Sequence, residues 1–530
     1  MQAKTKIVIA LATFVFVLFM VTLRGNFLFE ELIALYIVPF APVGTLLVVT
    51  SLVARIRKHP LTLERRVRRL LIACSTFHCL FIAVFLYCTW PRYYDRADAV
   101  EDIDYFVKTL EDVHPKLYDR VTREEFADSV ETVKAKISGS IGENDLFMDI
   151  SRIGALVQDG HTGNGYSYFM RRGNLLLRRM FPYKIKVEND RIHVTGNYSY
   201  KDDIPAGSEI VRINGFTSRE FINQMSALLS YETLPYRNSL IANPMFIAIW
   251  NDFREYVVEY RLPQSSELRS IAASGGIYAR IQFIRSLTAL RQPYEFRVVA
   301  DSIGYIGFYQ CSDLERFKGF LKETFETVKN KRMSHLIIDV RRNGGGNSAL
   351  GDEFMQYISR KPFRTFDRVT VKVSKEILSL YPDWTDLSKR EPGSLFEVPD
   401  IPLTPLRKNP LRFDGDCILL TSRNTFSSAS DFASAFRCFD VGAIVGAETG
   451  GITVCYGDVY EFTLPKTTFG FGVSFKKFTN ACGVDDRRGV IPDYFVESSL
   501  SDEGKGTDTV LEFAVELTRK PGLRRGSPVL

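Results

Sequence analysis

The sequence predicts an α/β protein behind a membrane anchor, and three observations carry that prediction. Apolar stretches without a charged residue fill most of the first 92 residues of the 530-residue chain. A helical part and a β-rich part follow. From about residue 305 strand-like and helix-like segments alternate, as they do in domains with parallel sheets. The predicted parts are a membrane module (1–92), a helical part (98–175), a β-module (180–265), an α/β core (266–500) and a C-terminal helix with a basic tail (501–530).

The membrane module is predicted from hydropathy. Each of three apolar runs approaches the ~20 residues that a helix needs to cross a bilayer. No small-residue cleavage site follows the first run, so we expect retained helices rather than a cleaved signal peptide. The predicted membrane helices cover residues 7–23, 32–54 and 70–90.

The distribution of charge predicts the orientation of this module. Residues 55–69, between the second and third runs, hold seven Lys and Arg, whereas the loop between the first two runs holds only Arg24. Positive loops stay in the cytoplasm. We therefore expect an integral membrane protein with a cytoplasmic N-terminus and everything after Trp90 outside, in the periplasm or at the cell surface.

The remaining charge argues against a nucleic-acid partner. The formal net charge is +6, but residues 1–92 hold 11 Lys and Arg against 3 Asp and Glu. The rest of the chain holds 57 basic and 59 acidic residues, which leaves no basic excess for a phosphate backbone. Its five cysteines follow neither a disulfide framework nor zinc-ligand spacing, so their pairing stays open and no metal is expected.

The helical part and the β-module are predicted from periodicity and turn signals. Residues 98–113 and 145–157 carry apolar side chains at helical spacing, and Thr122 with Glu125 forms a capping box that opens a helix between them. The β-branched or alternating segments that follow predict strands at residues 183–187, 192–195, 209–213 and 256–260.

The α/β core is predicted from its alternating segments. The predicted strands are residues 305–309, 335–340, 417–421 and 442–445. The predicted helices are residues 313–330, 349–358 and 427–439.

Two strand-to-helix junctions of the core carry the residues that could do chemistry. Three glycines, 344–346, follow the first strand, and their backbone N–H groups before a helix would suit an anion or an oxyanion. The alternative is a plain tight turn. At the second junction, Ser427 and Ser428 open a helix, where a hydroxyl lies near aligned N–H groups, although serine is also an ordinary helix cap.

A serine nucleophile needs a general base, and His161 is the best candidate. It lies in a glycine-flanked turn at residues 160–163, from which its side chain could project into a cleft. The other histidines after the membrane module, His114, His193 and His335, fall at a helix end or in strands.

Taken together, these motifs resemble the tail-specific, or C-terminal processing, family of serine peptidases, in the branch close to the tricorn core protease. The likeness covers roughly residues 98–500 and implies a ClpP/crotonase-like α/β catalytic core. The matching segments are Asp339 to Gly346 (Asp-x-Arg-x-Asn-Gly-Gly-Gly), 425–429 with the paired serines, Gly446 with 449–451, 159–162 (Asp-Gly-His-Thr) and 489–493 (Gly-Val-x-Pro-Asp).

The resemblance implies a role for each candidate residue. Ser427 would be the nucleophile, His161 the base and Asp486 the carboxylate that holds the histidine, with Asp485 as the adjacent alternative. A lysine base is not expected, because residues 451–453 read Gly-Ile-Thr where better-known members carry the lysine nearby. The implied oxyanion hole consists of the backbone N–H groups of Gly344, Gly345 and Ser428.

The β-module adds a second resemblance, because residues 204–215 are similar to the second half of a PDZ domain, a module that binds peptide ends. The resemblances together predict a membrane-anchored extracytoplasmic serine endopeptidase that cleaves unfolded chains or C-terminal tails without a metal or cofactor. They also leave room for a homo-oligomer. The alternative is a catalytically inactive peptide-binding or sensor protein on the same fold.

Overall fold

The structure, a computed structural model, describes residues 92–163, 179–198, 204–243, 247, 255–277, 292–300, 302–398, 401–499, 502 and 506–519. The three predicted membrane helices lie outside these residues. Within the described ranges, no helix combines the length and the apolar character needed to cross a bilayer. All described residues except Ile277 belong to one compact unit.

The helical part packs three helices together beside a small pair of strands. The predicted capping box is present, since Thr122 and Glu125 exchange hydrogen bonds at the start of the second helix. The buried faces carry the apolar stripe that the sequence predicts, with Phe106 and Leu110 fully buried. The elements are β1 (Tyr93–Asp95), α4 (Arg96–Val113), the 3₁₀ turn Leu117–Asp119, α5 (Arg123–Lys136), β2 (Ser140–Gly142) and α6 (Glu143–Ala155).

The β-module is an antiparallel sheet in the order β4-β5-β6-β8-β9, with β7 paired to β6. Two helices that the sequence pattern did not predict follow β7, and each begins after a threonine cap, Thr217 or Thr233. The elements are β3 (Arg179–Met180), β4 (Tyr183–Glu188), β5 (Arg191–Asn197), β6 (Glu209–Ile213), β7 (Phe216–Thr217), α9 (Ser218–Ser226), α10 (Leu234–Ile241), β8 (Glu255–Arg261), β9 (Leu268–Ser274) and β10 (Gly276–Ile277).

The α/β core is built on a sheet in the order β11-β12-β13-β16-β17-β20. Strand β11 runs antiparallel to β12, and the other neighbours are parallel, which confirms the mixed α/β class. The strands are β11 (Tyr294–Ala300), β12 (Ile303–Phe308), β13 (His335–Asp339), β16 (Asp416–Thr421), β17 (Gly442–Gly446) and β20 (Tyr494–Phe495).

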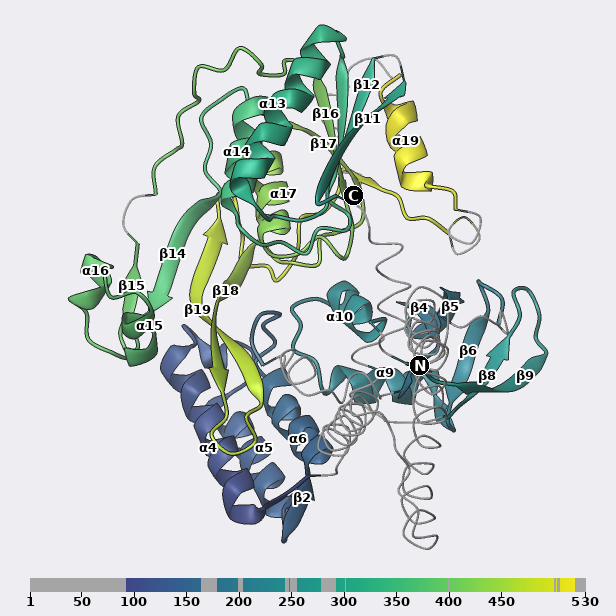
Figure 1. The fold of residues 1–530 in the computed structure, drawn as a ribbon, viewed down its shortest axis with the longest axis vertical. Coiled ribbons are helices and arrows are strands. Elements are labelled where there is room, and N and C mark those ends of the chain that lie inside the picture. The colour runs from purple at the N-terminus through teal and green to yellow at the C-terminus, as the bar shows by residue number, and fades with distance from the viewer. Residues whose placement is uncertain are drawn as a thin grey trace, which may run out of the picture. The chain divides into compact units, whose positions relative to one another are not determined.

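Helices cover both faces of this sheet (Figure 1). Alternate strand residues point to opposite sides, so Ile338 and Leu419 join one apolar cluster while Ile337 and Leu420 join another. The first cluster is covered by α13 (Leu314–Asn330), α14 (Ala349–Ile358) and α17 (Ser428–Cys438), and the second by α19 (Thr509–Leu517).

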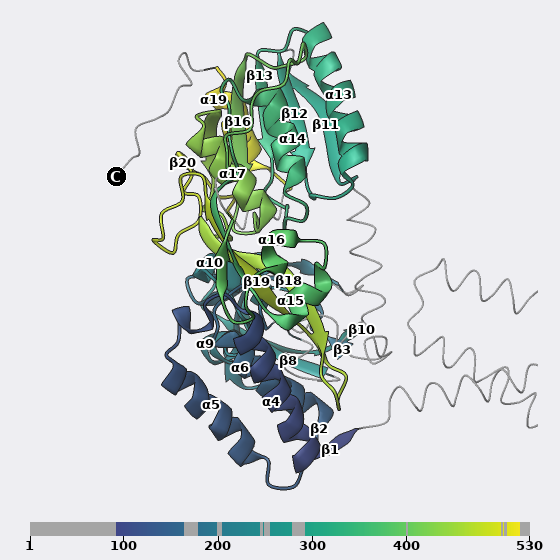
Figure 2. The same cartoon turned by 90° about the vertical axis from the view of Figure 1, so that its left-hand side faces the viewer.

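A second, antiparallel sheet in the order β15-β14-β19-β18 extends from the core. Its long hairpin, β18 and β19, lies beside helices α4 and α6 of the helical part (Figure 2). Phe106 packs on Phe471 with ring centroids 4.8 Å apart, and the buried Asp102 accepts the backbone N–H groups of Lys466 and Thr467. The elements are β14 (Phe366–Lys372), α15 (Lys375–Leu380), α16 (Thr385–Ser388), β15 (Leu395–Glu397), β18 (Val454–Thr463) and β19 (Gly470–Asn480).

The structure also answers the question of cysteine pairing for the described residues. Cys438 at the end of α17 and Cys482 after β19 form a disulfide with Cα atoms 5.6 Å apart. Three further cysteines, Cys311, Cys417 and Cys455, are free and buried.

Candidate active site

The two junctions singled out in the sequence meet at one edge of the core sheet. Strands β13 and β16 are parallel neighbours, so the loops that leave their carboxyl ends lie side by side. Phe426 donates its N–H to the carbonyl of Asn343 at 3.0 Å, and Ser428 Oγ donates to the carbonyl of Gly346 at 2.6 Å. These bonds tie the start of α17 to the glycine loop.

Ser427 occupies a strained turn between β16 and α17. Its backbone has φ 51° and ψ −133°, a combination that costs free energy for a residue with a side chain. A serine held on a sharp strand-to-helix turn exposes its Oγ, as in the nucleophile elbow of α/β-hydrolases. The close approach of the glycine loop requires a glycine at 345, because a Cβ there would lie 2.7 Å from Ser427 Cβ.

His161 lies against this serine, although 266 residues separate them in sequence. Its Nε2 is 3.0 Å from Ser427 Oγ, which is a hydrogen-bonding distance. The imidazole stacks on the Phe426 ring with centroids 4.8 Å apart, and Tyr236 stacks on the other side of that ring at 4.0 Å. The structure therefore brings together the two residues that the sequence singled out from separate motifs.

The turn that carries His161 is held in place by Asp159, which is fully buried. Its carboxylate accepts the backbone N–H of His161 at 3.0 Å, the hydroxyl of Thr162, and the hydroxyl of Ser474 in β19 at 2.6 Å. Gly163 also donates its N–H to the carbonyl of Gly472. The hairpin therefore fixes the position of the histidine.

His114 is a member of this cluster that the sequence did not single out. It is 2 % exposed, and its Nδ1 accepts the backbone N–H of Lys116, so the ring hydrogen lies on Nε2. That Nε2 is 3.4 Å from Asp159 Oδ2. Burial opposes ionisation of Asp159, but His114 and His161 outweigh it and hold the pKa of this carboxyl well below its usual value.

The electrostatics around His161 favour its protonated form. Burial works against the charge, yet the neighbouring Asp159 carboxylate and, more weakly, Glu232 and Asp431 raise the pKa of the imidazole above its usual value. Burial also raises the pKa of Glu232 to about 8 and that of Asp431 to about 7. Perturbed acids that surround one histidine are typical of a catalytic site.

The structure does not bring Asp486 to the histidine. Asp486 is exposed and accepts the backbone N–H of Arg488 at 2.9 Å, and Asp485 pairs with Lys477 at 3.5 Å. No ion pair in the described part of the chain joins either carboxylate to His161. Asp159 and Glu232 do lie close to that ring, since one carboxyl oxygen of each and one ring nitrogen of His161 lie within 4.8 Å of one another.

Two of the three expected oxyanion donors have a free N–H group. Gly344 and Ser428 line the cleft, and among the described residues neither backbone N–H has an acceptor. Gly345 differs from the expectation, because its N–H donates to Asn343 Oδ1 at 2.9 Å. Gly345 therefore provides room for Ser427 rather than a free N–H group.

These residues line a cleft of about 1280 Å³ that is large enough for a peptide segment. One wall carries His161, Phe426 and Ser427, and the hairpin contributes aromatic side chains such as Phe462 and Phe471. The buried acid Asp431 faces the same space. The lining mixes apolar and polar side chains, so the cleft offers both apolar contacts and hydrogen-bonding groups to a bound molecule.

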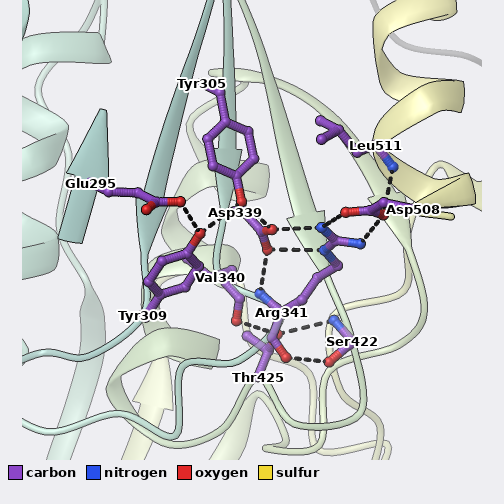
Figure 3. A network of polar contacts seen from close by, with 10 residues as sticks. All are labelled: Glu295, Tyr305, Tyr309, Asp339, Val340, Arg341, Ser422, Thr425, Asp508 and Leu511. Atoms are coloured by element: carbon purple, nitrogen blue, oxygen red, sulfur yellow. Dashed lines mark hydrogen bonds and ion pairs between the residues drawn. The ribbon is translucent and has the colours of Figure 1, made fainter. Parts of the chain in front are cut away.

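An ion-pair network anchors the base of the glycine loop (Figure 3). Arg341 donates to Asp339 through Nε and Nη2, at 3.0 and 2.6 Å, and to both oxygens of Asp508 at 2.7 and 2.8 Å. Tyr305 adds a hydrogen bond to Asp339 at 2.7 Å. Since Asp508 is the N-cap of α19, the network joins the C-terminal helix to the oxyanion loop.

The cluster around His161 also bears on the question of a metal. Asp159, His161 and Glu232 are close enough together for one cation. However, Nε2 of the histidine faces Ser427, as expected for a general base, and we treat the cluster as a hydrogen-bonding group. That the site needs neither metal nor cofactor stays a prediction.

Comparison with known proteins identifies a family domain in the core. Residues 302–496 match the model of peptidase family S41. No curated protein matches the chain. Among solved structures, mature CPAF aligns with a TM-score of 0.58 at 12% identity over 81% of this chain and 99% of its own, and a mutant of CPAF with 0.62 at 12% identity over 82% and 99%.

The tricorn protease, whose branch the sequence resembles, aligns less well. Its TM-score is 0.36 at 15% identity, over 80% of this chain and 36% of its own. The tricorn branch and the histidine base stay predictions. The family match to the core, on the fold described above, supports the coarser assignment: residues 302–496 carry a peptidase family S41 domain, and the protein is a serine peptidase.

Proposed function

We propose that the protein is an endopeptidase that hydrolyses peptide bonds in unfolded chains or C-terminal tails, with Ser427 as nucleophile and His161 as general base. The observation that carries this proposal is the 3.0 Å approach of His161 Nε2 to Ser427 Oγ on a strained turn. A cleft of about 1280 Å³ beside these two side chains, which could hold a peptide segment, supports a polypeptide substrate.

The reaction follows from the placement of these groups. Ser427 Oγ attacks the peptide carbonyl carbon while its proton moves to His161 Nε2, and the carbonyl oxygen becomes an anion. The N–H groups of Gly344 and Ser428 stabilise that oxyanion. His161 then gives the proton to the leaving amine, and a water molecule, activated by the same histidine, releases the acid from Ser427.

A Ser427→Ala variant tests this assignment. It should fold but lose hydrolysis of an unfolded peptide, and a fluorophosphonate should label the wild type and not the variant. Ser348→Ala is a matched control, because Ser348 lines the same cleft and its side chain caps no helix. Labelling that persists in Ser427→Ala would refute the assignment, and a wild type that neither reacts nor hydrolyses would favour the inactive peptide-binding alternative.

We also propose that the peptidase is anchored in a membrane and works outside the cytoplasm. The support is in the sequence, which contains apolar runs at residues 7–23, 32–54 and 70–90. The basic loop 55–69 lies between the second and the third of these runs. A protease added to sealed, right-side-out vesicles should digest the catalytic part without detergent. Protection of that part would overturn the orientation. Sedimentation of the detergent-solubilised protein would test the expected homo-oligomer.

A further inference from the structure

The nitrogen of His161 that faces away from Ser427 has no hydrogen-bond partner. This Nδ1 is buried. If Nε2 is to accept the serine proton, the ring hydrogen must be on Nδ1, and a buried N–H group without an acceptor is costly. Peptidases of this type supply a carboxylate at that position.

Asp159 does not fill this position, although it is close. Its Oδ1 is 3.7 Å from Nδ1, which is too long for a hydrogen bond. The same carboxylate already faces the backbone N–H of His161, the hydroxyls of Thr162 and Ser474, and His114 Nε2. A carboxylate offers about four acceptor positions, so Asp159 is occupied by the turn that it builds.

Glu232 is the neighbouring group with free acceptors. Both of its carboxyl oxygens are buried and neither has a hydrogen-bond partner. One carboxyl oxygen of Glu232 lies within 4.8 Å of a ring nitrogen of His161, and each of these two residues has a buried polar atom without a hydrogen-bond partner. The residues around Glu232 are fixed to the site, because Ser230 Oγ accepts the N–H of Asp159 at 3.0 Å and Thr233 Oγ1 donates to the carbonyl of Gly450 at 3.2 Å.

We propose that Glu232, from the connection between α9 and α10, is the positioning residue that accepts the Nδ1–H of His161 and stabilises its protonated ring. The inference rests on the proposed function. It assigns to the β-module a role that the family resemblance gives to Asp486, beyond the hairpin. A rotation of the Glu232 side chain toward Nδ1 satisfies both unpaired groups at once.

The charge of Glu232 makes this role depend on pH. The groups that act on it are His161, Asp159 and Arg120, with the backbone of Ile452 and the Cys455 thiol nearby. Burial and the Asp159 charge raise its pKa to about 8, so near neutral pH Glu232 holds a proton in the free enzyme. When His161 takes the serine proton, its positive charge favours the Glu232 carboxylate, which releases that proton to water. We therefore expect kcat/KM to rise as the pH passes through about 8.

Three variants test the proposal, each assayed with a fluorogenic peptide from pH 6.5 to 9.5. Glu232→Gln should lose about 10- to 1000-fold in kcat/KM near pH 9, because an opposite charge at this range shifts a pKa by about 1–3 units. Near pH 6.5 the loss should be much smaller. Glu255→Gln, an exposed position in β8 of the same module, should keep the wild-type profile. Asp486→Asn should keep it as well.

Several results would overturn the inference. If Glu232→Gln lowers kcat/KM by the same factor at all pH values, Glu232 has a structural role. If kcat/KM does not fall at all, Glu232 has no role in the reaction. Loss in Asp486→Asn alone would return the role to that residue. Activity removed by EDTA and restored by Zn²⁺ would assign the cluster to a cation. Melting curves check that each variant folds, and Ser427→Ala separates a failure of this inference from a failure of the proposed function.

Discussion

Gly345→Ala should disable the site, and the structure allows the effect to be separated into two parts. Gly345 has φ +100°, a conformation that costs an L-residue about 1–3 kcal/mol. The added Cβ would also lie 2.7 Å from Ser427 Cβ, 2.9 Å from Phe426 O and 3.0 Å from Ser428 N. Since carbon atoms in contact lie about 3.5–4.0 Å apart, the two loops must separate by about 1 Å.

Two other glycines provide matched controls. Gly393 has φ +94° with nothing within 4 Å of an added Cβ, so Gly393→Ala measures the backbone cost alone. Gly344 has neither a positive φ nor a neighbour within 4 Å, so Gly344→Ala should leave the urea midpoint close to that of the wild type. The expected order of destabilisation is Gly345→Ala, then Gly393→Ala, then Gly344→Ala.

The assays are urea unfolding and peptide hydrolysis. Gly393→Ala should lose about 1–2 kcal/mol of unfolding free energy and keep full activity. Gly345→Ala should lose more and also lose activity by about 100-fold, which is the typical effect of a 1 Å misplacement of a catalytic group. If Gly345→Ala matches Gly393→Ala in stability and keeps wild-type turnover, the close packing of the glycine loop on the nucleophile is not what positions it.

Three further predictions concern the surrounding structure. Because burial raises the pKa of Asp431 to about 7, the folded protein loses stability as the pH rises from about 4 to 7. The Asp431→Asn variant should therefore have a higher melting temperature than the wild type at pH 8 but not at pH 4. An equal shift of the melting temperature at both pH values would contradict this prediction. Reducing the bond between Cys438 and Cys482, 44 residues apart, should lower the unfolding free energy by about 2–5 kcal/mol in urea titrations with and without dithiothreitol. A lysine at position 341 cannot bind Asp508 through two parallel hydrogen bonds, so Arg341→Lys should lower both the melting temperature and the turnover. Wild-type values for both would show that the ion-pair network does not hold the glycine loop in place.

The core and the pair of candidate residues, Ser427 and His161, could be predicted from the sequence because their signals are local. Ser427 and His161 each lie in a short motif whose glycines and helix start are visible without any tertiary information. Helix α9 also had such a signal, since Thr217 and Glu220 form a capping box. That helix follows the strands β6 and β7 directly, so the strand-like residues before the capping box favour a continued β-region in the sequence pattern.

The environment of the histidine could not be predicted in the same way. Glu232 belongs to no motif, and its proximity to His161 arises only when the β-module packs beside the glycine-flanked turn. The expectation for Asp486 rested on its distance from the closing motif, and spacing does not reveal that this side chain hydrogen-bonds within its own exposed loop. The burial of His114 could not be predicted either, because its ring packs on Tyr456 of β18, in a hairpin that follows much later in the chain.

That dependence on the hairpin has a consequence for the order in which the protein becomes active during synthesis. The turn that holds His161 is made long before the residues that fix it, Gly472 and Ser474 of β19. A growing chain that has just completed Ser427 therefore contains both candidate residues but not the strand that fixes the histidine turn. We expect the site to form only after β19 has left the ribosome, so that an incomplete chain would be inactive.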